Sequence, residues 1–400
     1  MSDLDFEKLL ASDAPPARPR DELPRGKYDF AIAYPDPGSL PLSGLLDSLR
    51  GALEEEGAGL ALYPDVQGYE PLRRYVAEKL HRDRGMTVDP EAVVLGDGSS
   101  QHISQVIGML VEPGDVVVAE DFFYTGTLTT MRMNGADVRG VACDGGGMIP
   151  EALDEVLTQA SDEGRGAKLI YTIPTFQNPQ GWTMPLERRR AMLEVSRSHG
   201  VPIFEDDCYV DLRYGGENVP AIHSLDPMGQ VMYVASFSKT IAPGVRMGYF
   251  VGPEEIVGRM RMIRKTGGSG VNQLAALAIE RYARKGLDGH IEEINSIQRQ
   301  RRDAMTAALG ENFGDRAEWS SPDGGLYLWL RMPEGSDIAS LSGQALAAGV
   351  GYQAGPMFAP DGVSGRNCAR LCFGYNTPEE IHEGIARMAR VFAEGGCLPD

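Results

Sequence analysis

Lys239 is the residue of this chain whose position most favours covalent chemistry. It follows an apolar run at 231–235, lies among hydroxyl side chains, and has Arg246 seven residues after it. A lysine held at the edge of a core beside a cation is costly to keep protonated, so its pKa falls. Its amine then becomes a nucleophile that can form a Schiff base with an aldehyde. A solvated loop lysine is the plain alternative, and four other segments bear on the choice.

Two hydroxyl-rich segments predict a place for a phosphate. A glycine turn followed by Ser99 and Ser100 opens a predicted helix, where free N–H groups, the helix dipole and the hydroxyls favour an anion. Read alone, such a turn is more often a simple helix cap. The segment around Lys239 adds two hydroxyls and a guanidinium, whose planar fork of donors suits a phosphate dianion. These groups belong to Ser236, Ser238 and Arg246.

Two loops carry side chains that suit a flat aromatic ligand. Tyr124 follows an apolar run at 116–119 and can stack on a ring, although an aromatic packed beneath a loop is the plainer interpretation. Asn178 lies in an Asn-Pro turn, where its amide can donate to a ligand oxygen or serve only the turn itself. Neither side chain identifies a ligand alone.

An acidic cluster ends a further apolar run. Asp206 at the end of a buried strand needs a partner, because an unpaired buried carboxylate is strongly destabilising. A protonated ring nitrogen is such a partner, and Tyr209, three residues later, can reach a phenolic oxygen on the same ring. A solvated acidic turn is the alternative, and we expect it for Glu205 and Asp207 rather than for Asp206.

The five segments together predict one ligand with a phosphate, an aldehyde, a phenolic oxygen and a ring nitrogen that can be protonated. Pyridoxal 5′-phosphate has all four groups. With an aspartate on its ring nitrogen it withdraws electrons from the α-carbon of an amino acid, and its resting form is a Schiff base with lysine.

The elements that must position these residues alternate between short apolar runs and helix-length periodic segments. Such alternation predicts a mostly parallel sheet covered on both faces by helices, with ligands at the carboxyl ends of the strands. The sequence pattern changes in the C-terminal part, where a long charged helix is expected at 290–309 and strands at 325–330 and 368–373. This pattern predicts a smaller α+β domain. The strands expected in the main sheet are 92–95, 116–119, 138–142, 168–173, 201–205, 231–235 and 248–251, with helices that include 100–110, 150–159 and 186–199.

These patterns divide the chain into four parts. Residues 1–27 are polar and proline-rich, which predicts an arm or a disordered lead. Residues 28–50 form an arm that joins the smaller domain. Residues 51–288 form the large domain with the predicted ligand site, and residues 289–400 form the smaller C-terminal domain.

Composition argues against several classes of function. The formal net charge of −19 disfavours nucleic acid or an anionic membrane as the main partner, since both require a basic face. No apolar run approaches the ~20 residues of a membrane span, and the first residues lack the features of a secretory signal. Five cysteines without a paired motif predict free thiols in a reducing cytoplasm and no metal site.

With these motifs the chain resembles a known family, the fold-type I class I/II aminotransferases that depend on pyridoxal 5′-phosphate. The resemblance runs from about Tyr28 to about Phe392, and it is nearest to the branch of 2-aminoadipate and kynurenine aminotransferases and the catalytic domain of MocR-type regulators. It implies an α/β PLP-transferase fold, with a large domain around a mostly parallel seven-stranded sheet and a smaller α+β domain. The family's motifs, in order, are matched by Asn178, Asp206, Tyr209, Ser236, Ser238, Lys239 and Arg246.

The resemblance implies a role for each matching residue. Lys239 resembles the Schiff-base lysine, and Asp206 resembles the partner of the pyridine nitrogen. Tyr209 and Asn178 resemble the pair that holds the phenolic oxygen, and Arg370 resembles the arginine that binds the substrate α-carboxylate. Tyr124 resembles the aromatic residue that stacks on the cofactor ring, and Tyr63 resembles the tyrosine that reaches the neighbouring subunit of a homodimer. The resemblance also implies a phosphate site formed by Ser99, Ser100, Ser236, Ser238 and Arg246.

The chain departs from this family at one wall of the predicted pocket. The branch usually reads Phe-x-Gly-Gly-x-Pro near its start, whereas this chain has Ile32 and Ala33 in place of the two glycines. Their side chains would narrow or reshape the substrate pocket, which Tyr34 would enter. Gln353 and Met357 are further candidates for contact with the substrate side chain.

Three functions are weighed. An aminotransferase is favoured, in which Lys239 moves a proton on the amino acid and a 2-oxo acid accepts the amino group, through the family's internal aldimine and quinonoid intermediate. The altered wall keeps open an elimination, replacement, cyclisation or oxidation of a specialised amino acid without net transamination. A transcription regulator with an aminotransferase-like sensor would need a basic winged-helix domain of roughly 70 residues, whereas about 27 residues precede the resemblance.

Overall fold

A seven-stranded, mostly parallel sheet forms the centre of the protein. The computed structural model describes residues 5–10, 14, 25–267 and 270–398. The strand order is β2-β10-β9-β8-β7-β3-β4, and β10 alone runs antiparallel to its neighbours. The predicted fold class is therefore confirmed. The strands are β2 (Val93–Gly96), β3 (Val116–Glu120), β4 (Asp137–Val141), β7 (Leu169–Thr172), β8 (Ile203–Asp206), β9 (Val231–Ser236) and β10 (Gly248–Val251).

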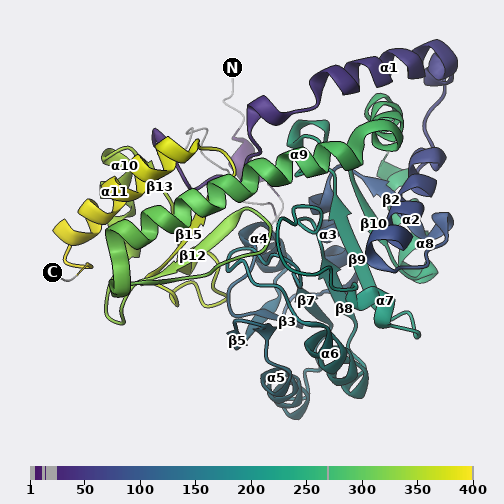
Figure 1. Ribbon diagram of the computed structural model, residues 1–400. Helices are drawn as coiled ribbons and strands as arrows, with labels where there is room; N and C mark the ends of the chain where they lie inside the picture. Colours follow the sequence, from purple (N-terminus) through teal and green to yellow (C-terminus); the bar gives the residue numbers. More distant parts are fainter. Residues whose placement is uncertain (1–4, 11–13, 15–24, 268–269, 399–400) are drawn as a thin grey trace.

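Helices cover both faces of this sheet because its strands are apolar on both sides (Figure 1). One face packs against α3 (Ser99–Leu110), α4 (Thr125–Met133) and α8 (Glu254–Gly267). The other face packs against α2 (Glu70–Arg84), α5 (Pro150–Asp162), α6 (Leu186–His199) and the first part of α9 (Gln273–Phe313). Residues of one strand alternate between these cores, as Val93 and Val94 do.

A smaller antiparallel sheet with its own core occupies the C-terminal part. Its strand order is β11 (Glu318–Trp319), β12 (Tyr327–Arg331), β15 (Cys368–Cys372) and β14 (Gln353–Ala354). It packs with α11 (Pro378–Glu394), which begins with a capping box between Thr377 and Glu380. The short β1 (Tyr28–Asp29) pairs with β13 (Val350–Gly351), so the segment after residue 27 joins this part of the molecule.

One helix connects the two parts. Helix α9 runs without a break for 41 residues, about 60 Å at 1.5 Å per residue, from the large sheet to the small one (Figure 1). The predicted helix at 290–309 is therefore only its second half. The proposed domain boundary at 288/289 lies inside α9, because buried apolar residues such as Leu277 and Leu287 continue its pattern upstream. The four-part division remains a prediction.

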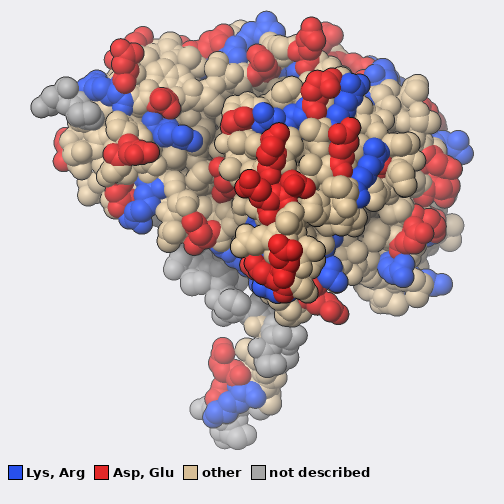
Figure 2. All heavy atoms as spheres, turned by 90° about the horizontal axis from the view of Figure 1, so that it is seen from below, with Lys and Arg blue, Asp and Glu red and all other residues tan. Residues whose placement is uncertain are grey.

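The N-terminal arm predicted for residues 1–27 lies largely outside the described residues. Within it, Phe6–Leu9 form a short 3-10 helix. Downstream, α1 (Leu42–Glu56) packs on α9. Acidic side chains gather at several places on the face seen in Figure 2, with lysines and arginines scattered between them. Among the described helices, none has the length and apolar character needed to cross a bilayer.

Candidate active site

The carboxyl edge of the large sheet opens into a cavity of about 540 Å³ that also reaches the small domain. Its lining includes twelve of the predicted site residues together with Gln353. Asn178 lies just behind the lining, whereas Tyr63 and Met357 lie elsewhere and are 98% and 51% exposed. The twelve are Ile32, Tyr34, Ser99, Ser100, Tyr124, Asp206, Tyr209, Ser236, Ser238, Lys239, Arg246 and Arg370.

Lys239 is presented by the turn that follows β9. Its Nζ donates a hydrogen bond of 2.9 Å to the carbonyl oxygen of Ala33, in the segment that departs from the family pattern. Burial lowers the pKa of Lys239, and the positive charges of Arg370 and Arg246 lower it further. The side chain therefore has the position and the electrostatic environment of an amine nucleophile.

Asp206 ends β8 with one carboxylate oxygen satisfied and the other free. Its Oδ2 accepts a hydrogen bond of 2.6 Å from the hydroxyl of Tyr171, whereas its Oδ1 is buried and has no partner among the described residues. Burial raises the pKa of Asp206, and the bond from Tyr171 partly offsets this effect. The free oxygen is an acceptor site at the floor of the cavity.

The acidic neighbours of Asp206 are buried, so our expectation of a solvated turn at Glu205 and Asp207 is wrong. Glu205 accepts bonds of 3.0 and 2.9 Å from the backbone of Ile222 and His223. Asp207 forms an ion pair of 2.7 Å with Arg84. These partners come from other segments of the chain, so the local sequence around Glu205 and Asp207 does not predict them.

A network of buried polar groups joins the large domain to the small one. The Arg370 Nη1 donates to the Asn178 Oδ1 over 3.0 Å, and the Asn178 amide lies 3.5 Å from the Tyr209 hydroxyl. The hydroxyls of Tyr209 and Tyr327 are 2.7 Å apart, and the Arg370 guanidinium lies 4.5 Å from the Tyr327 ring centre. Tyr327 and Tyr171 were not among the predicted site residues, because a tyrosine in a mostly apolar strand is equally typical of a core residue.

The hydroxyl and guanidinium groups form an anion cradle at the N-terminus of α3. Ser236 and Ser238 are hydrogen-bonded to each other over 2.7 Å, and the Arg246 guanidinium donates to the Asp97 carbonyl over 2.7 Å. Gly98 has a φ of 74°, and a Cβ there would lie 2.5 Å from the Arg246 guanidinium. Only glycine leaves room for Arg246 beside the first turn of the helix.

The donor set of this cavity fits pyridoxal 5′-phosphate. The anion cradle suits the phosphate, and the unpartnered Asp206 Oδ1 suits a protonated ring nitrogen. Tyr124 is half-buried on the lining of the same cavity. Among the described residues, no group of three or more His, Cys, Asp or Glu side chains is placed to hold a metal ion.

Replacing Tyr171 with Phe is expected to raise the pKa of Asp206 further, because a hydrogen bond to the ionised form is lost. Asp206 would then be protonated at higher pH, so the acidic limb of the pH–activity profile moves upward. Thr127→Val removes the other partner of Tyr171 and is the control, with no shift expected. An unmoved limb in Tyr171→Phe would exclude Asp206 as the titrating group.

Comparisons with known proteins agree with this geometry. The model of the family "Aminotransferase class I and II" matches residues 36–388. Aromatic-amino-acid aminotransferase 1 of Thermococcus litoralis is 33% identical over 91% of this chain and 88% of its own length. Two uncharacterized HTH-type transcriptional regulators of Bacillus subtilis also match in sequence.

Solved structures match over nearly the whole chain. A kynurenine aminotransferase from Pyrococcus horikoshii, in complex with PMP, has a TM-score of 0.88 at 32% identity, covering 92% of this chain and 91% of that one. An alpha-aminoadipate aminotransferase from Thermus thermophilus, complexed with N-(5′-phosphopyridoxyl)-L-leucine, has a TM-score of 0.87 at 27% identity, covering 98% and 99%.

These matches show that the chain belongs to the aminotransferase class I and II family. It is a transaminating enzyme whose cofactor is pyridoxal 5′-phosphate. The family, fold class, cofactor and reaction predicted from the sequence are therefore confirmed.

Proposed function

We propose that this enzyme takes its amino group from an aromatic amino acid and passes it to a 2-oxo acid. The observation that carries this proposal is the set of side chains facing the cavity between Lys239 and the small domain: Ile32, Tyr34, Tyr327 and Gln353. Three are large and apolar or aromatic, which suits a flat side chain. The Gln353 Oε1 is buried without a partner among the described residues, which suits a donor on the substrate ring.

Each predicted site residue then has one task. When bound, pyridoxal 5′-phosphate supplies an aldehyde and a ring that withdraws electrons. The Lys239 amine would hold the aldehyde and, when free, would move a proton at the α-carbon of the amino acid. The free Asp206 Oδ1 holds the proton of the ring nitrogen. Tyr209 and Asn178 hold the phenolic oxygen.

The remaining residues position the reactants. Arg370 presents its guanidinium to the α-carboxylate, with one nitrogen fixed by the Ala31 carbonyl and another by Asn178. Tyr124 would stack on the cofactor ring. Ser99, Ser100, Ser236, Ser238 and Arg246 would hold the phosphate at the start of α3, where the helix dipole favours an anion.

A donor panel tests the proposed substrate class. With 2-oxoglutarate as acceptor, we expect kcat/KM for phenylalanine and tyrosine to exceed that for leucine and 2-aminoadipate. Gln353→Leu is expected to lower kcat/KM for tyrosine about tenfold while leaving phenylalanine unchanged. A preference for 2-aminoadipate would contradict the aromatic assignment. Turnover that needs no 2-oxo acid would instead support elimination, replacement, cyclisation or oxidation of a specialised amino acid.

We also propose that the enzyme is a cytoplasmic homodimer with shared active sites, in which Tyr63 reaches the phosphate of the neighbouring subunit. The support is a band of exposed apolar side chains on α1 and the residues after it, unusual for a monomer surface. All five cysteines are free, as expected in a reducing compartment. The band consists of Leu42, Leu46, Leu53, Leu60, Leu62 and Tyr63.

Light scattering tests the dimer directly. We expect a mass of twice 43.3 kDa for the protein, and the monomer mass for Leu46→Glu combined with Leu62→Glu. Met228→Glu, at an exposed apolar residue outside this band, serves as the control. Tyr63→Phe is expected to keep the dimer but weaken cofactor binding about tenfold. A monomeric parent protein would overturn both statements.

A further inference from the structure

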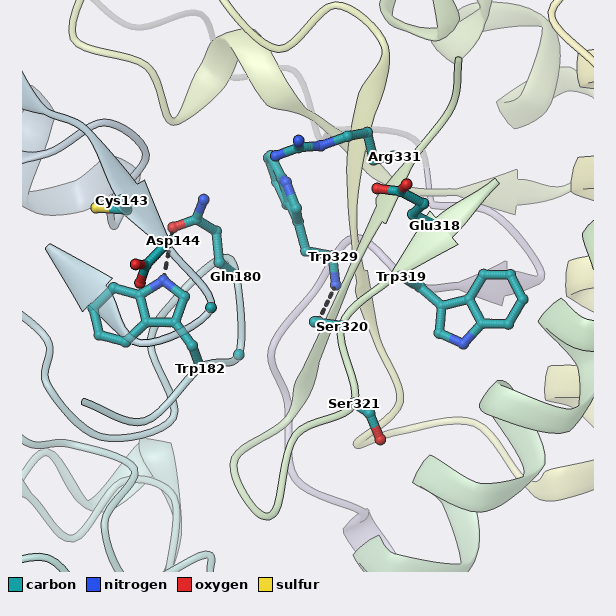
Figure 3. A pocket seen from close by; sticks show the side chains of 12 residues that line it. Cys143, Asp144, Gln180, Trp182, Glu318, Trp319, Ser320, Ser321, Trp329 and Arg331 are labelled. Carbon is teal, nitrogen blue, oxygen red and sulfur yellow. Dashed lines mark hydrogen bonds between the residues drawn. The ribbon is translucent and has the colours of Figure 1, made fainter. Parts of the chain in front are cut away.

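A second cavity of about 440 Å³ lies where the large domain meets the small sheet (Figure 3). From the large domain it is lined by the hairpin of β5 (Cys143–Asp144) and by the loop Gln180–Trp182. From the small domain it is lined by β11 and β12. None of its lining residues belongs to the cavity that holds Lys239.

Two tryptophans stand on opposite sides of this second cavity (Figure 3). The indole nitrogen of Trp182 donates to the Gln180 side chain over 2.9 Å. Trp329 is only 5% exposed, yet its Nε1 has no hydrogen-bond partner among the described residues. A buried indole N–H usually has an acceptor, so this one indicates a ligand that brings an acceptor between the two rings.

The charged groups of the second cavity favour an anion beside Trp329. Arg331 follows two residues later on β12 and therefore lies on the same face of the strand. Its guanidinium interacts with Asp121 and with the thiol of Cys368, neither of which lines the cavity. Asp144 is already neutralised by Arg188 over 2.6 Å. Two acids oppose an anion beside Arg331: Glu318, its partner in the strand register, and Asp121 behind the lining.

The second cavity adjoins the residues that bind substrate. Trp329 is the register partner of Arg370, and its ring lies 5.9 Å from that of Phe358. The Arg370 guanidinium lies 5.2 Å from the same Phe358 ring. On the other wall, Trp182 belongs to the loop that carries Asn178. Arg370 and Asn178 are hydrogen-bonded to each other. A ligand held between Trp182 and Trp329 would therefore contact the strand beside Arg370 and the loop that carries Asn178.

We propose that the second cavity is a binding site for an aromatic carboxylate. The aromatic ring lies between Trp182 and Trp329, and the carboxylate accepts from the Trp329 Nε1 and the Arg331 guanidinium. Because the second cavity is separate from Lys239, the bound carboxylate is not converted. Because this cavity adjoins the segments that carry Arg370 and Asn178, the bound carboxylate changes the affinity of the enzyme for its amino acid.

Phenylacetate is the probe, since it has neither an amino nor an oxo group. All three tryptophans of the chain, Trp182, Trp319 and Trp329, line this cavity, so the intrinsic emission of the holoenzyme reports on it directly. We expect a saturable change in emission with phenylacetate and none with phenylacetamide, which keeps the ring but lacks the charge. We also expect the KM for the amino donor to change at saturating phenylacetate.

Three variants separate this site from the active site. Arg331→Gln is expected to weaken phenylacetate binding about tenfold, and Glu318→Gln to tighten it, because the two changes have opposite effects on an anion. Arg370→Gln is expected to leave this binding unchanged. Binding that is lost in Arg370→Gln and unaffected in Arg331→Gln would place phenylacetate in the active site and overturn the proposal. Absence of any saturable change in emission would overturn it as well.

Discussion

Replacing Lys239 with Ala is expected to lower turnover by roughly 10⁴-fold, because both the amine nucleophile and the group that moves the α-proton are lost. The fold should be unaffected, since the Lys239 Nζ makes a single hydrogen bond, to Ala33. Borohydride reduction of the holoenzyme, followed by peptide mapping, should place a pyridoxyl group on the peptide that contains Lys239.

Lys265 offers a matched control for this experiment. It lies on the exposed side of α8, and Lys265→Ala should retain full activity and leave the labelled peptide unchanged. Turnover in Lys239→Ala within tenfold of the parent enzyme, or a pyridoxyl group on another lysine, would remove Lys239 from the reaction.

Replacing Asp206 with Asn is expected to lower kcat by about 10³-fold while the melting temperature stays nearly constant. The amide has the size of the carboxylate and can keep the contact with Tyr171. It lacks the negative charge that stabilises a proton on the ring nitrogen. Stopped-flow kinetics of the amino donor with the loaded enzyme measures the loss.

The same substitution at the neighbouring Asp207 is expected to affect stability rather than kcat. Asp207→Asn removes the carboxylate that forms an ion pair with the buried Arg84, and such a loss typically destabilises a protein by about 3–5 kcal/mol. We expect a melting temperature lower by several degrees, with kcat close to normal in the enzyme that remains folded. Equal kcat losses in the two variants would mean that Asp206 acts through the structure rather than on the cofactor.

The sequence predicted the sheet and most of the site because both depend on local patterns. Buried parallel strands are short apolar runs, and their carboxyl ends fall at one edge whatever the details of packing. Lys239 and Asp206 each directly follow or end such a run, and the structure places both on one cavity. Gly98 and Ser99 are likewise predictable, because a glycine turn before a helix has a characteristic composition.

Contacts between distant segments were not predictable in the same way. The burial of Glu205 depends on backbone groups at 222 and 223, and the role of Tyr171 depends on where β7 lies beside β8. The second cavity joins Trp182 to Trp329, which are separated by more than a hundred residues. Single-sequence patterns describe periodicity within an element and carry no information on such pairings.

The continuity of α9 limits where the chain can tolerate insertions and deletions. Each residue of an α-helix advances the chain by about 1.5 Å and turns it by about 100°. Because α9 is packed against the large sheet at one end and the small sheet at the other, deleting one residue in its middle would rotate the two cores out of phase. Insertions and deletions are therefore expected in exposed turns such as 361–365, whereas the length of α9 must stay fixed.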